Sequence, residues 1–426
     1  MNTSIIALII LLVTIIMFII NKLPAPIVGL GSLFLMVFFK VCSFNEAFSG
    51  FSDSIVILMA SSMTIGIAMF KTGTAQIIGR QVIKFSHGNE KNFLIASCIV
   101  SGMLAMFLAN TAVLASFIPI IDSVCRSKEQ MKSKNLLLPI ACAVMFGGAS
   151  TLIGCTPQLT ANALMEKMIG LKMSMWTLTP VGLILFATFI LYTYFIGYKT
   201  SVKIWGNEEN IDLNVDEEKR QSVYNVNYDK KKVVIMSILC VAMVFLYVTN
   251  ILPTVMTALL IAILSVVFGL IDLKDIMAEL RWDTIVFLAS CLGIANALTL
   301  SKAGELIGDF VSRSIININS PIIVLSILTL LTLVLSQFIT NSTAIIVILP
   351  IAIELCKVFN YNAITFTVAI IYAASIAFLT PLAAAQITMT QIAGYKFIDY
   401  FKYGVLLTVI CYIEIIIFVP LFYAIT

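Results

Sequence analysis

The stretch Ser336-Gln-Phe-Ile-Thr-Asn-Ser-Thr-Ala-Ile-Ile-Val-Ile-Leu-Pro350 places a cluster of polar side chains inside a long apolar run. A second stretch, Phe107-Leu-Ala-Asn-Thr-Ala-Val-Leu-Ala-Ser-Phe-Ile-Pro119, has the same pattern. In both, an Asn lies beside hydroxyl residues and a Pro follows nine positions later. Because lipid cannot hydrogen-bond an amide or a hydroxyl, such groups at membrane depth must face protein, water or a bound solute. Two matching clusters predict a binding site built from two parts.

Composition makes the chain a polytopic membrane protein rather than a set of soluble domains. Of its 426 residues, 60% are hydrophobic and only 11% are charged, so lipid is the expected solvent for most of its surface. The Lys and Arg residues gather in loops and not along one helix face, which gives no indication of nucleic-acid binding. The apolar run at 5–20 lacks the basic region and cleavage site of a signal peptide, so it is expected to remain as a membrane span.

The residues that serve most enzymes and metal sites are scarce in this chain. Its nine Cys are scattered without a Cys-x-x-Cys pair and are interpreted as small core residues. The single His, His87, lies in a charged loop. We therefore expect no cofactor, no histidine metal centre and no catalytic triad, and an intramembrane enzyme is only a remote alternative.

Apolar runs predict two halves with the same order of elements. Each half has three spans, an amphipathic piece, a hairpin with a polar tip, a broken span and a last span. In the first half (1–198) they fall at 4–20, 24–41, 53–70, 74–85, 92–125, 136–165 and 174–197. After a charged linker at 199–232, the second half (233–426) repeats them at 233–249, 253–270, 283–300, 303–314, 321–357, 363–391 and 403–424.

Individual residues keep register between the halves. Offsets of 229 to 231 relate Asn21 to Asn250, Pro24 to Pro253, Asp53 to Asp283, Gly79 to Gly308 and Asn110 to Asn341. The broken spans match through Thr156-Pro157 and Thr380-Pro381, which Gly170 and Gly394 follow at equal distance. Gly and Pro free backbone groups, which is tolerated at membrane depth only where the backbone lines a cavity. Such a repeat is typical of transporters, and Asp53 and Asp283 are expected to be helix N-caps.

The predicted fold is therefore all-α with two inverted repeats, each of five transmembrane helices plus one re-entrant hairpin. Two ordinary spans in place of each hairpin are the alternative, with the same parity. Most Lys and Arg fall on one side, which the positive-inside rule makes cytoplasmic. Both termini are then external, and the hairpins of Asn110 and Asn341 enter from opposite sides. The expected location is the plasma (inner) membrane of a bacterium.

The two tips and two breaks supply amides, hydroxyls, freed carbonyls and helix N-termini. Helix N-termini attract carboxylate, sulfate or phosphate oxygens, whereas carbonyl, Asn and Ser/Thr oxygens suit Na⁺. No Lys, Arg, Asp or Glu lies at the tips or breaks, so an anion held there needs bound cations to balance its charge. Symport of an anion with cations is thus favoured over proton antiport, which usually needs a buried carboxylate. Glu414, inside the last span, is the candidate for proton coupling and is expected to face a polar neighbour.

These motifs together resemble the divalent anion–sodium symporter family of the ion transporter superfamily. The resemblance covers both halves and is carried by Asn110-Thr111 with Pro119, Asn341-Ser342-Thr343 with Pro350, Gly147–Pro157, and Ala373–Pro381 followed by Tyr400–Gly404. It implies Na⁺-coupled symport of a di- or tricarboxylate or of sulfate. It also implies a homodimer in which a transport domain slides against a fixed scaffold, an elevator mechanism. A sodium/proton antiporter or an arsenite-type exporter of the same superfamily is the alternative.

The resemblance also implies roles for individual residues. The anion would be bound by Asn110, Thr111, Thr156, Pro157, Asn341, Ser342, Thr343, Thr380 and Pro381. One Na⁺ would use Asn110, Ser150 and Gly154, and a second would use Ser336, Thr340, Asn341 and backbone near Leu379. The chain departs from the family at Ala109 and Ala105, where hydroxyl residues are expected. The stronger cation site is therefore predicted in the second half.

Overall fold

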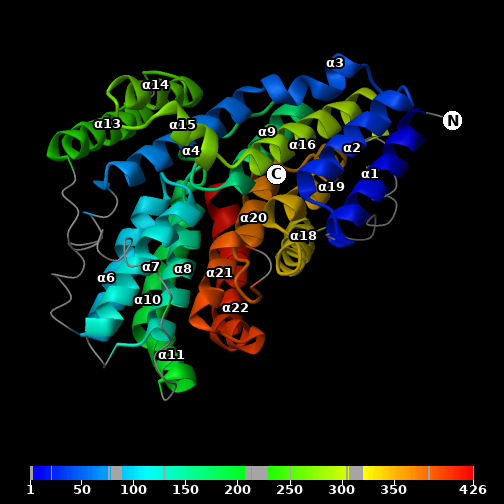
Figure 1. Ribbon diagram of the computed structural model, residues 1–426. Coiled ribbons are helices and arrows are strands. Elements are labelled where there is room, and N and C mark those ends of the chain that lie inside the picture. The colour runs from blue at the N-terminus through cyan, green and yellow to red at the C-terminus, as the bar shows by residue number, and fades with distance from the viewer. Residues whose placement is uncertain are drawn as a thin grey trace.

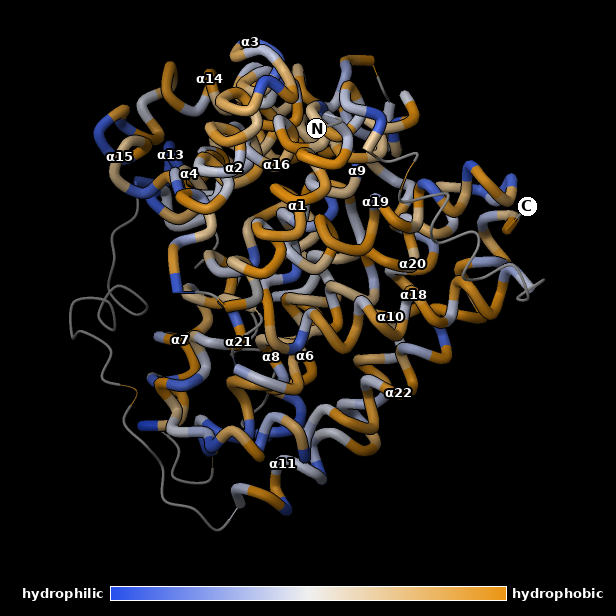
Figure 2. Tube along the Cα trace, turned by 90° about the vertical axis from the view of Figure 1, so that its right-hand side faces the viewer, coloured by the Kyte–Doolittle hydropathy of each residue, from blue (hydrophilic) through white to orange (hydrophobic). Residues whose placement is uncertain are grey.

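The computed structural model describes residues 3–20, 22–74, 77, 89–127, 131–206, 213, 229–249, 251–303, 306, 320–381 and 384–425. In these ranges every regular element is a helix, which confirms the predicted all-α fold (Figure 1). By length and composition, six helical segments can cross a membrane, namely 44–71, 179–205, 230–249, 282–300, 341–359 and 397–422. Most of the helices consist largely of apolar residues, which Figure 2 shows in orange.

Among the described residues, the first half of the chain contains the predicted spans, hairpin and broken span in the predicted order. Its helices are α1 (Thr3–Ile20), α2 (Ala25–Phe38), α3 (Phe44–Ala47), α4 (Ser54–Lys71), α6 (Glu90–Ala105), α7 (Asn110–Ser127), α8 (Ser133–Gly148), α9 (Thr156–Ile169), α10 (Thr179–Tyr192) and α11 (Tyr198–Trp205). A 3-10 segment, η1 (Phe48–Ser52), leads into α4, and a π-helical segment, η2 (Thr193–Gly197), joins α10 to α11.

The second half repeats this series of elements. Its helices are α13 (Lys230–Thr249), α14 (Thr254–Val267), α15 (Leu273–Glu279), α16 (Trp282–Leu300), α18 (Pro321–Ser336), α19 (Asn341–Phe359), α20 (Ala363–Ser375), α21 (Ala385–Met389) with the 3-10 turn η3 (Thr390–Ala393), and α22 (Phe397–Phe422). The two predicted hairpins correspond to α6–α7 and α18–α19. The two predicted broken spans correspond to α8–α9 and to α20 followed by α21 and η3.

Polar side chains start several of these helices by satisfying their free backbone N–H groups. Asp53 accepts from the N–H of Ile55 at 3.0 Å and caps α4, as the sequence predicted. Asn362 caps α20 in the same way, through the N–H of Ile364 at 3.0 Å. In both cases the cap fixes where an apolar helix begins, because the preceding residue is extended.

The predicted boundary between the first half and the linker is wrong by several residues. The last helix of the first half continues through α11 to Trp205, so the linker does not begin at 199. Trp205 is fully buried, and its ring lies 5.0 Å from that of Tyr395. This packing holds the extension. The amphipathic pieces predicted at 74–85 and 303–314, and the pairs Asn21–Asn250 and Gly79–Gly308, lie largely or wholly outside the described residues.

Corresponding helices of the two halves run antiparallel, as an inverted repeat requires. Lys71, at the end of α4, pairs with Glu279, just before α16, at 2.8 Å. At the opposite end of the same helix pair, Asn296 of α16 donates to the carbonyl of Glu46, just before α4, at 2.9 Å. The end of each helix therefore meets the start of its counterpart.

The last helices of the halves have the same relation. The Tyr192 hydroxyl of α10 donates to the carbonyl of Tyr403, near the start of α22, at 3.1 Å. The hydroxyl of Tyr423, just after α22, donates to the carbonyl of Thr177, just before α10. Two independent helix pairs thus indicate the inverted topology.

The helices form two bodies, each with elements from both halves of the chain (Figure 1). The first body contains α1–α4 and α13–α16, in which α2 packs on α16 and α4 packs on α14. The second body contains α6–α11 and α18–α22, in which α6 packs on α8 and α18 packs on α20. Helix α9 of the second body contacts both α4 and α16 of the first.

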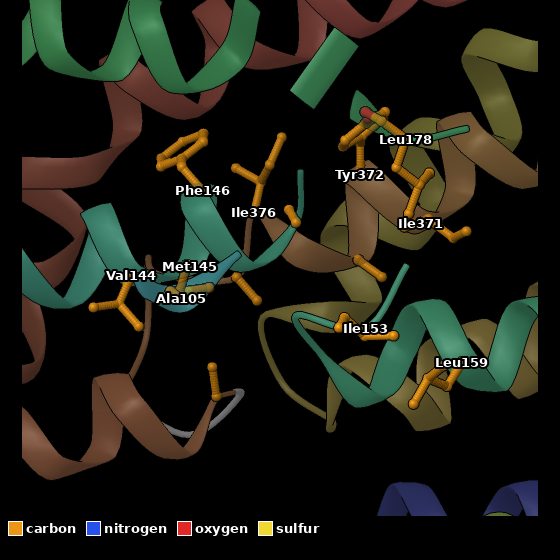
Figure 3. Packing of buried hydrophobic residues seen from close by; sticks show 14 of the residues in the cluster. Ala105, Val144, Met145, Phe146, Ile153, Leu159, Leu178, Ile371, Tyr372 and Ile376 are labelled. Atoms are coloured by element: carbon orange, nitrogen blue, oxygen red, sulfur yellow. The ribbon is translucent and has the colours of Figure 1, made fainter. Parts of the chain in front are cut away.

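The centre of the second body is apolar and closely packed. Helix α8 has all its residues buried, and α19 and α20 are buried over most of their length. The ring of Phe146, near the end of α8, lies 5.9 Å from that of Phe378, in the break after α20. Figure 3 shows Phe146 beside Ile376. The breaks of the two halves are therefore neighbours.

Candidate functional site

A cavity of about 260 Å³ lies between the two bodies. Its wall comes from α2, α4 and α16 of the first body and from α7, α9, α19 and α21 of the second. Both hairpin tips and both helix breaks open onto it. The first tip meets the break between α8 and α9, midway along that pair of helices. In a re-entrant hairpin, the turn between α6 and α7 lies inside the bundle, where it can contact this break. If α6 and α7 were two complete spans, that turn would lie at the membrane surface.

The structure brings together many, but not all, of the predicted site residues. Those that line the cavity are Asn110, Thr111, Gly154, Thr156, Pro157, Thr340, Asn341 and Ser342. The predicted residues that are not among those lining it are Ser150, Ser336, Thr343, Leu379, Thr380 and Pro381. The first set contains both tip asparagines, so the structure brings the two predicted tips to one space.

Helices α7, α9, α16 and α19 all begin at the cavity. Asn110 and Asn341 are the first residues of α7 and α19, and Thr156 is the first residue of α9. Each helix start presents unpaired backbone N–H groups and about half a positive charge. Several such ends directed at one small space favour an anion there.

The first half-site has buried oxygens that lack hydrogen bonds. Asn110 is 7% exposed, and its Nδ2 donates to Sγ of Cys155 at 2.8 Å. The described residues offer its Oδ1 no partner. Gln158, fully buried, donates through Nε2 to the carbonyl of Gly148 at 3.2 Å, while its Oε1 also has no partner in the described structure. Orphaned amide oxygens beside a freed carbonyl suit a hard cation such as Na⁺.

Glycines let the first tip and the first break touch through their backbones. A Cβ on Gly148 would lie 2.3 Å from Oδ1 of Asn110. A Cβ on Gly154 would lie 2.2 Å from the carbonyl oxygen of Gly148 and 2.9 Å from that of Ala105. No side chain fits these positions, so the glycines bring the two carbonyls toward one point.

The second half-site is held mainly by side-chain hydrogen bonds. Thr340 caps α19 by accepting from the N–H of Thr343 at 3.3 Å, and the two hydroxyls lie 2.7 Å apart. The hydroxyl of Ser336 donates to the carbonyls of Leu333 at 2.9 Å and Ala373 at 3.4 Å. Ser336 and Thr340, both predicted as Na⁺ ligands, are thus engaged with protein groups. Among the described atoms, Oδ1 of Asn341 lacks a partner.

One pair of equivalent hydrogen bonds ties each tip to its own break. The hydroxyl of Thr151 donates to the carbonyl of Met106, and that of Thr380 donates to the carbonyl of Gln337. Met106 and Gln337 each precede the tip Asn by four positions. Thr380 is therefore the counterpart of Thr151.

This equivalence corrects the matching of Thr156-Pro157 with Thr380-Pro381. Thr156 begins α9, whereas its counterpart by the same offset, Ala385, begins α21. Both helical segments end at a left-handed Gly, Gly170 and Gly394. The segment before Gly394 is shorter than the segment before Gly170. Equal distances from the two glycines therefore paired Thr156-Pro157 with Thr380-Pro381, although these residues are not equivalent in space.

Sequence reasoning missed a charged pair at the cavity wall. Nη2 of Arg281 lies 3.2 Å from Oδ2 of Asp283, with 48% and 59% of the side chains exposed. Both residues line the cavity at the start of α16. Asp283 was expected to be an N-cap, but the N-cap position belongs to Arg281, and Asp283 lies inside the first turn. The sequence analysis expected no charged side chains at the tips and breaks, and that remains correct. The cavity nevertheless contains charge, because part of its wall is α16, which belongs to the first body.

Two further residues were missed or set aside. Gln337 lies in the opening stretch and was visible as a polar residue in an apolar run, and it bonds to the second break. Gln158 follows the Thr156-Pro157 pair, and its buried side chain donates to the carbonyl of Gly148 in the first break. The expectation for Glu414 is confirmed, since it accepts from the hydroxyl of Thr188 at 2.6 Å.

Comparison with known proteins gives this architecture a family context. The citrate transporter (CitMHS) family model matches residues 15–345. An uncharacterized transporter of Synechocystis is 30% identical over 177 residues, which cover 42% of this chain and 29% of that protein. The chain thus spans less than a third of that relative. The sodium-dependent dicarboxylate transporter SdcS of Staphylococcus saprophyticus is 22% identical, over 85% of this chain and 75% of its own.

A solved structure agrees with the fold. MtrF of Neisseria gonorrhoeae, described within a class of antimetabolite efflux pumps, superposes with a TM-score of 0.66 at 15% identity. The superposition covers 89% of this chain and 83% of that chain. Likeness at this identity concerns the fold alone.

Proposed function

Because the chain belongs to the citrate transporter family, we propose that it is a secondary transporter coupling uptake of a divalent anion to Na⁺. The anion classes are di- and tricarboxylates and sulfate. Family membership confirms the resemblance to the divalent anion–sodium symporters, and relatives include proteins named sodium-dependent dicarboxylate transporters. The protein is accordingly a membrane transporter, and its substrate and coupling ion are the proposed part.

The observation that carries the proposal is the cavity where both tips and both breaks meet. Four helix starts and Arg281 supply positive potential for an anion. Asn110 lines the same cavity, and its orphaned amide oxygen suits Na⁺. One small space thus offers complementary partners to an anion and to its counter-cation.

We assign roles to the residues at the cavity on this basis. The helix starts at Asn110, Thr156 and Asn341 receive carboxylate or sulfate oxygens, with Thr111 and Ser342 as hydroxyl donors. The amide oxygen of Asn110 turns toward Na⁺. Substrate and cation then stabilise each other, because each cancels charge that the other would leave uncompensated in a low-dielectric space.

The position of the cavity between the bodies supports an elevator movement of the second body against the first. A cross-link between the bodies should stop uptake while leaving substrate binding intact, and uptake by the cross-linked protein would contradict the movement. We retain a homodimer as the proposed assembly, to be checked by light scattering of the purified protein.

The proposed function is tested in proteoliposomes with labelled succinate, citrate and sulfate, each with and without an inward Na⁺ gradient. Uptake of at least one anion should require Na⁺. If none of them moves and a pH gradient alone drives Na⁺ flux, the sodium/proton antiporter is correct. Extrusion of arsenite would instead identify the exporter alternative.

A further inference from the structure

The two helix breaks are closed in different ways. In the first break the carbonyl of Gly147 accepts directly from the N–H of Ser150 at 3.0 Å, which closes a tight turn. The equivalent residues of the second break, by the offset that relates Thr151 to Thr380, are Ile376 and Leu379. There the side chain of Gln337 lies between the two groups. Its Nε2 donates to the Ile376 carbonyl at 3.0 Å, and its Oε1 accepts from the Leu379 N–H at 3.0 Å.

The Gln337 amide uses both of its N–H groups on backbone carbonyls. Nε2 also donates to the carbonyl of Leu333, near the end of α18, at 3.0 Å. The residue is 4% exposed, so these bonds form away from solvent. Carbonyl oxygens that converge from a helix end and a break are the environment in which transporters bind cations. In this half an amide supplies the positive partial charge instead.

The first half has no such group. Met106 occupies the position equivalent to Gln337, and a thioether has no N–H to donate. Oδ1 of Asn110 and Oε1 of Gln158 have no partner among the described residues, and both side chains are more than nine-tenths buried. At the second tip, the amide oxygen that lacks a partner in the described part of the chain is Oδ1 of Asn341. One amide oxygen does not make a Na⁺ site, whereas several oxygens do.

We propose that the side-chain amide of Gln337 stands in for a bound cation at the second break, so that the coupling Na⁺ binds in the first half. This inference rests on the proposed Na⁺ coupling. It reverses the sequence prediction, which placed the stronger cation site in the second half. Gln337 acts as a positioning residue, since it joins the second tip and the second break in one arrangement with or without Na⁺.

The test measures Na⁺ binding without transport, as the rise in melting temperature (Tm) when NaCl replaces choline chloride at equal ionic strength. The full-length protein in detergent should show a Na⁺-dependent rise. Asn110→Ala should abolish that rise, and Asn341→Ala should retain it. Loss of the rise in Asn341→Ala, or its persistence in Asn110→Ala, would overturn the assignment to the first half.

A second set of variants tests Gln337 itself. Gln337→Glu keeps the acceptor for Leu379 but replaces the N–H groups by an oxygen, so it should create a new Na⁺ response that persists in the Asn110→Ala background. That response should grow as the pH rises, because the protonated acid can donate to a carbonyl as the amide does. A purely structural role predicts no such pH dependence, and a double variant without any Na⁺ response would refute the proposal.

Two controls keep the outcomes distinct. Met106→Gln places a side-chain amide at the equivalent position of the first half and should weaken the Na⁺ response. An unchanged response would contradict the proposal that an amide at this position takes the place of a bound cation. If Gln337→Glu does not fold, Gln337→Met, which imports the residue of the first half, takes its place and should likewise gain a Na⁺ response. A wild-type protein with no Na⁺ response at all would contradict the proposed coupling ion rather than the role of Gln337 alone.

Discussion

The two tip–break units share one layout but are held together by different forces. In the first, glycines bring backbones into contact, and the amide oxygens of Asn110 and Gln158 have no partner among the residues that the structure describes. In the second, the side chain of Gln337 satisfies the groups freed by the break. An inverted repeat can thus keep its geometry while one unit satisfies its freed groups internally and the other leaves oxygens available to a ligand.

The largest effects are expected at the two tip asparagines. Asn110→Ala and Asn341→Ala should each lower uptake at least about tenfold, the loss expected when a buried hydrogen-bonding partner of a charged group is removed. The two variants should differ in kind. Asn110→Ala should raise the Na⁺ concentration needed for half-maximal uptake, and Asn341→Ala should mainly raise KM for the anion.

Initial rates measured against Na⁺ and anion concentration separate these outcomes. Asn296→Ala is the matched control, because its amide bonds to the carbonyl of Glu46 away from the cavity. Uptake close to wild type in both Asn110→Ala and Asn341→Ala would contradict the proposal that the two tips form the binding site.

The next prediction tests whether Gly148 is needed for Na⁺ activation. An Ala at position 148 would place its Cβ 2.3 Å from Oδ1 of Asn110, so Gly148→Ala should displace that oxygen and reproduce the Na⁺ defect of Asn110→Ala. Overpacking of this kind costs about 1–3 kcal/mol. Gly66→Ala is the control, because a Cβ there meets no atom within 4 Å. Equal Na⁺ activation in the two glycine variants would show that the close approach is not needed.

A smaller effect compares the equivalent tip–break bonds. Thr151→Val and Thr380→Val each remove one buried hydroxyl bond, worth about 1 kcal/mol. Thr151→Val should lower Tm more, because the second tip is still bonded to its break through Gln337. Thermal unfolding in detergent measures the difference. A larger loss for Thr380→Val would contradict the view that the second unit is the better tied.

The smallest effect concerns the charged pair, Arg281 and Asp283, that α16 brings to the cavity. Arg281→Gln should raise KM for the anion by about threefold, and Asp283→Asn should lower it by a similar factor, since exposed pairs contribute up to about 1 kcal/mol. Both changes should shrink at high ionic strength. Lys71→Gln, which breaks a pair with Glu279 outside the cavity, is the control. Identical shifts for Arg281→Gln and Lys71→Gln would assign the effect to net charge.

Much of the fold follows from local sequence. Helices α7 and α19 begin at Asn110 and Asn341, the residues around which the sequence placed the tips. Asp53 caps α4, as expected from an acidic residue before an apolar run. Asp283 was expected to cap α16 because it corresponds to Asp53 in the repeat. In the structure Arg281 occupies the N-cap position, so the repeated residue does not have the same role.

Local sequence predicts the spans, the breaks, the hairpin tips and the inverted order of the halves. It could do so because lipid leaves no alternative to continuous helices, and every polar interruption must therefore have a purpose. Local sequence does not show which oxygens of the described residues lack partners or which charges reach the cavity. Those properties depend on how helices distant in the chain pack together, as α16 brings Arg281 to the cavity and Gln337 reaches into the second break.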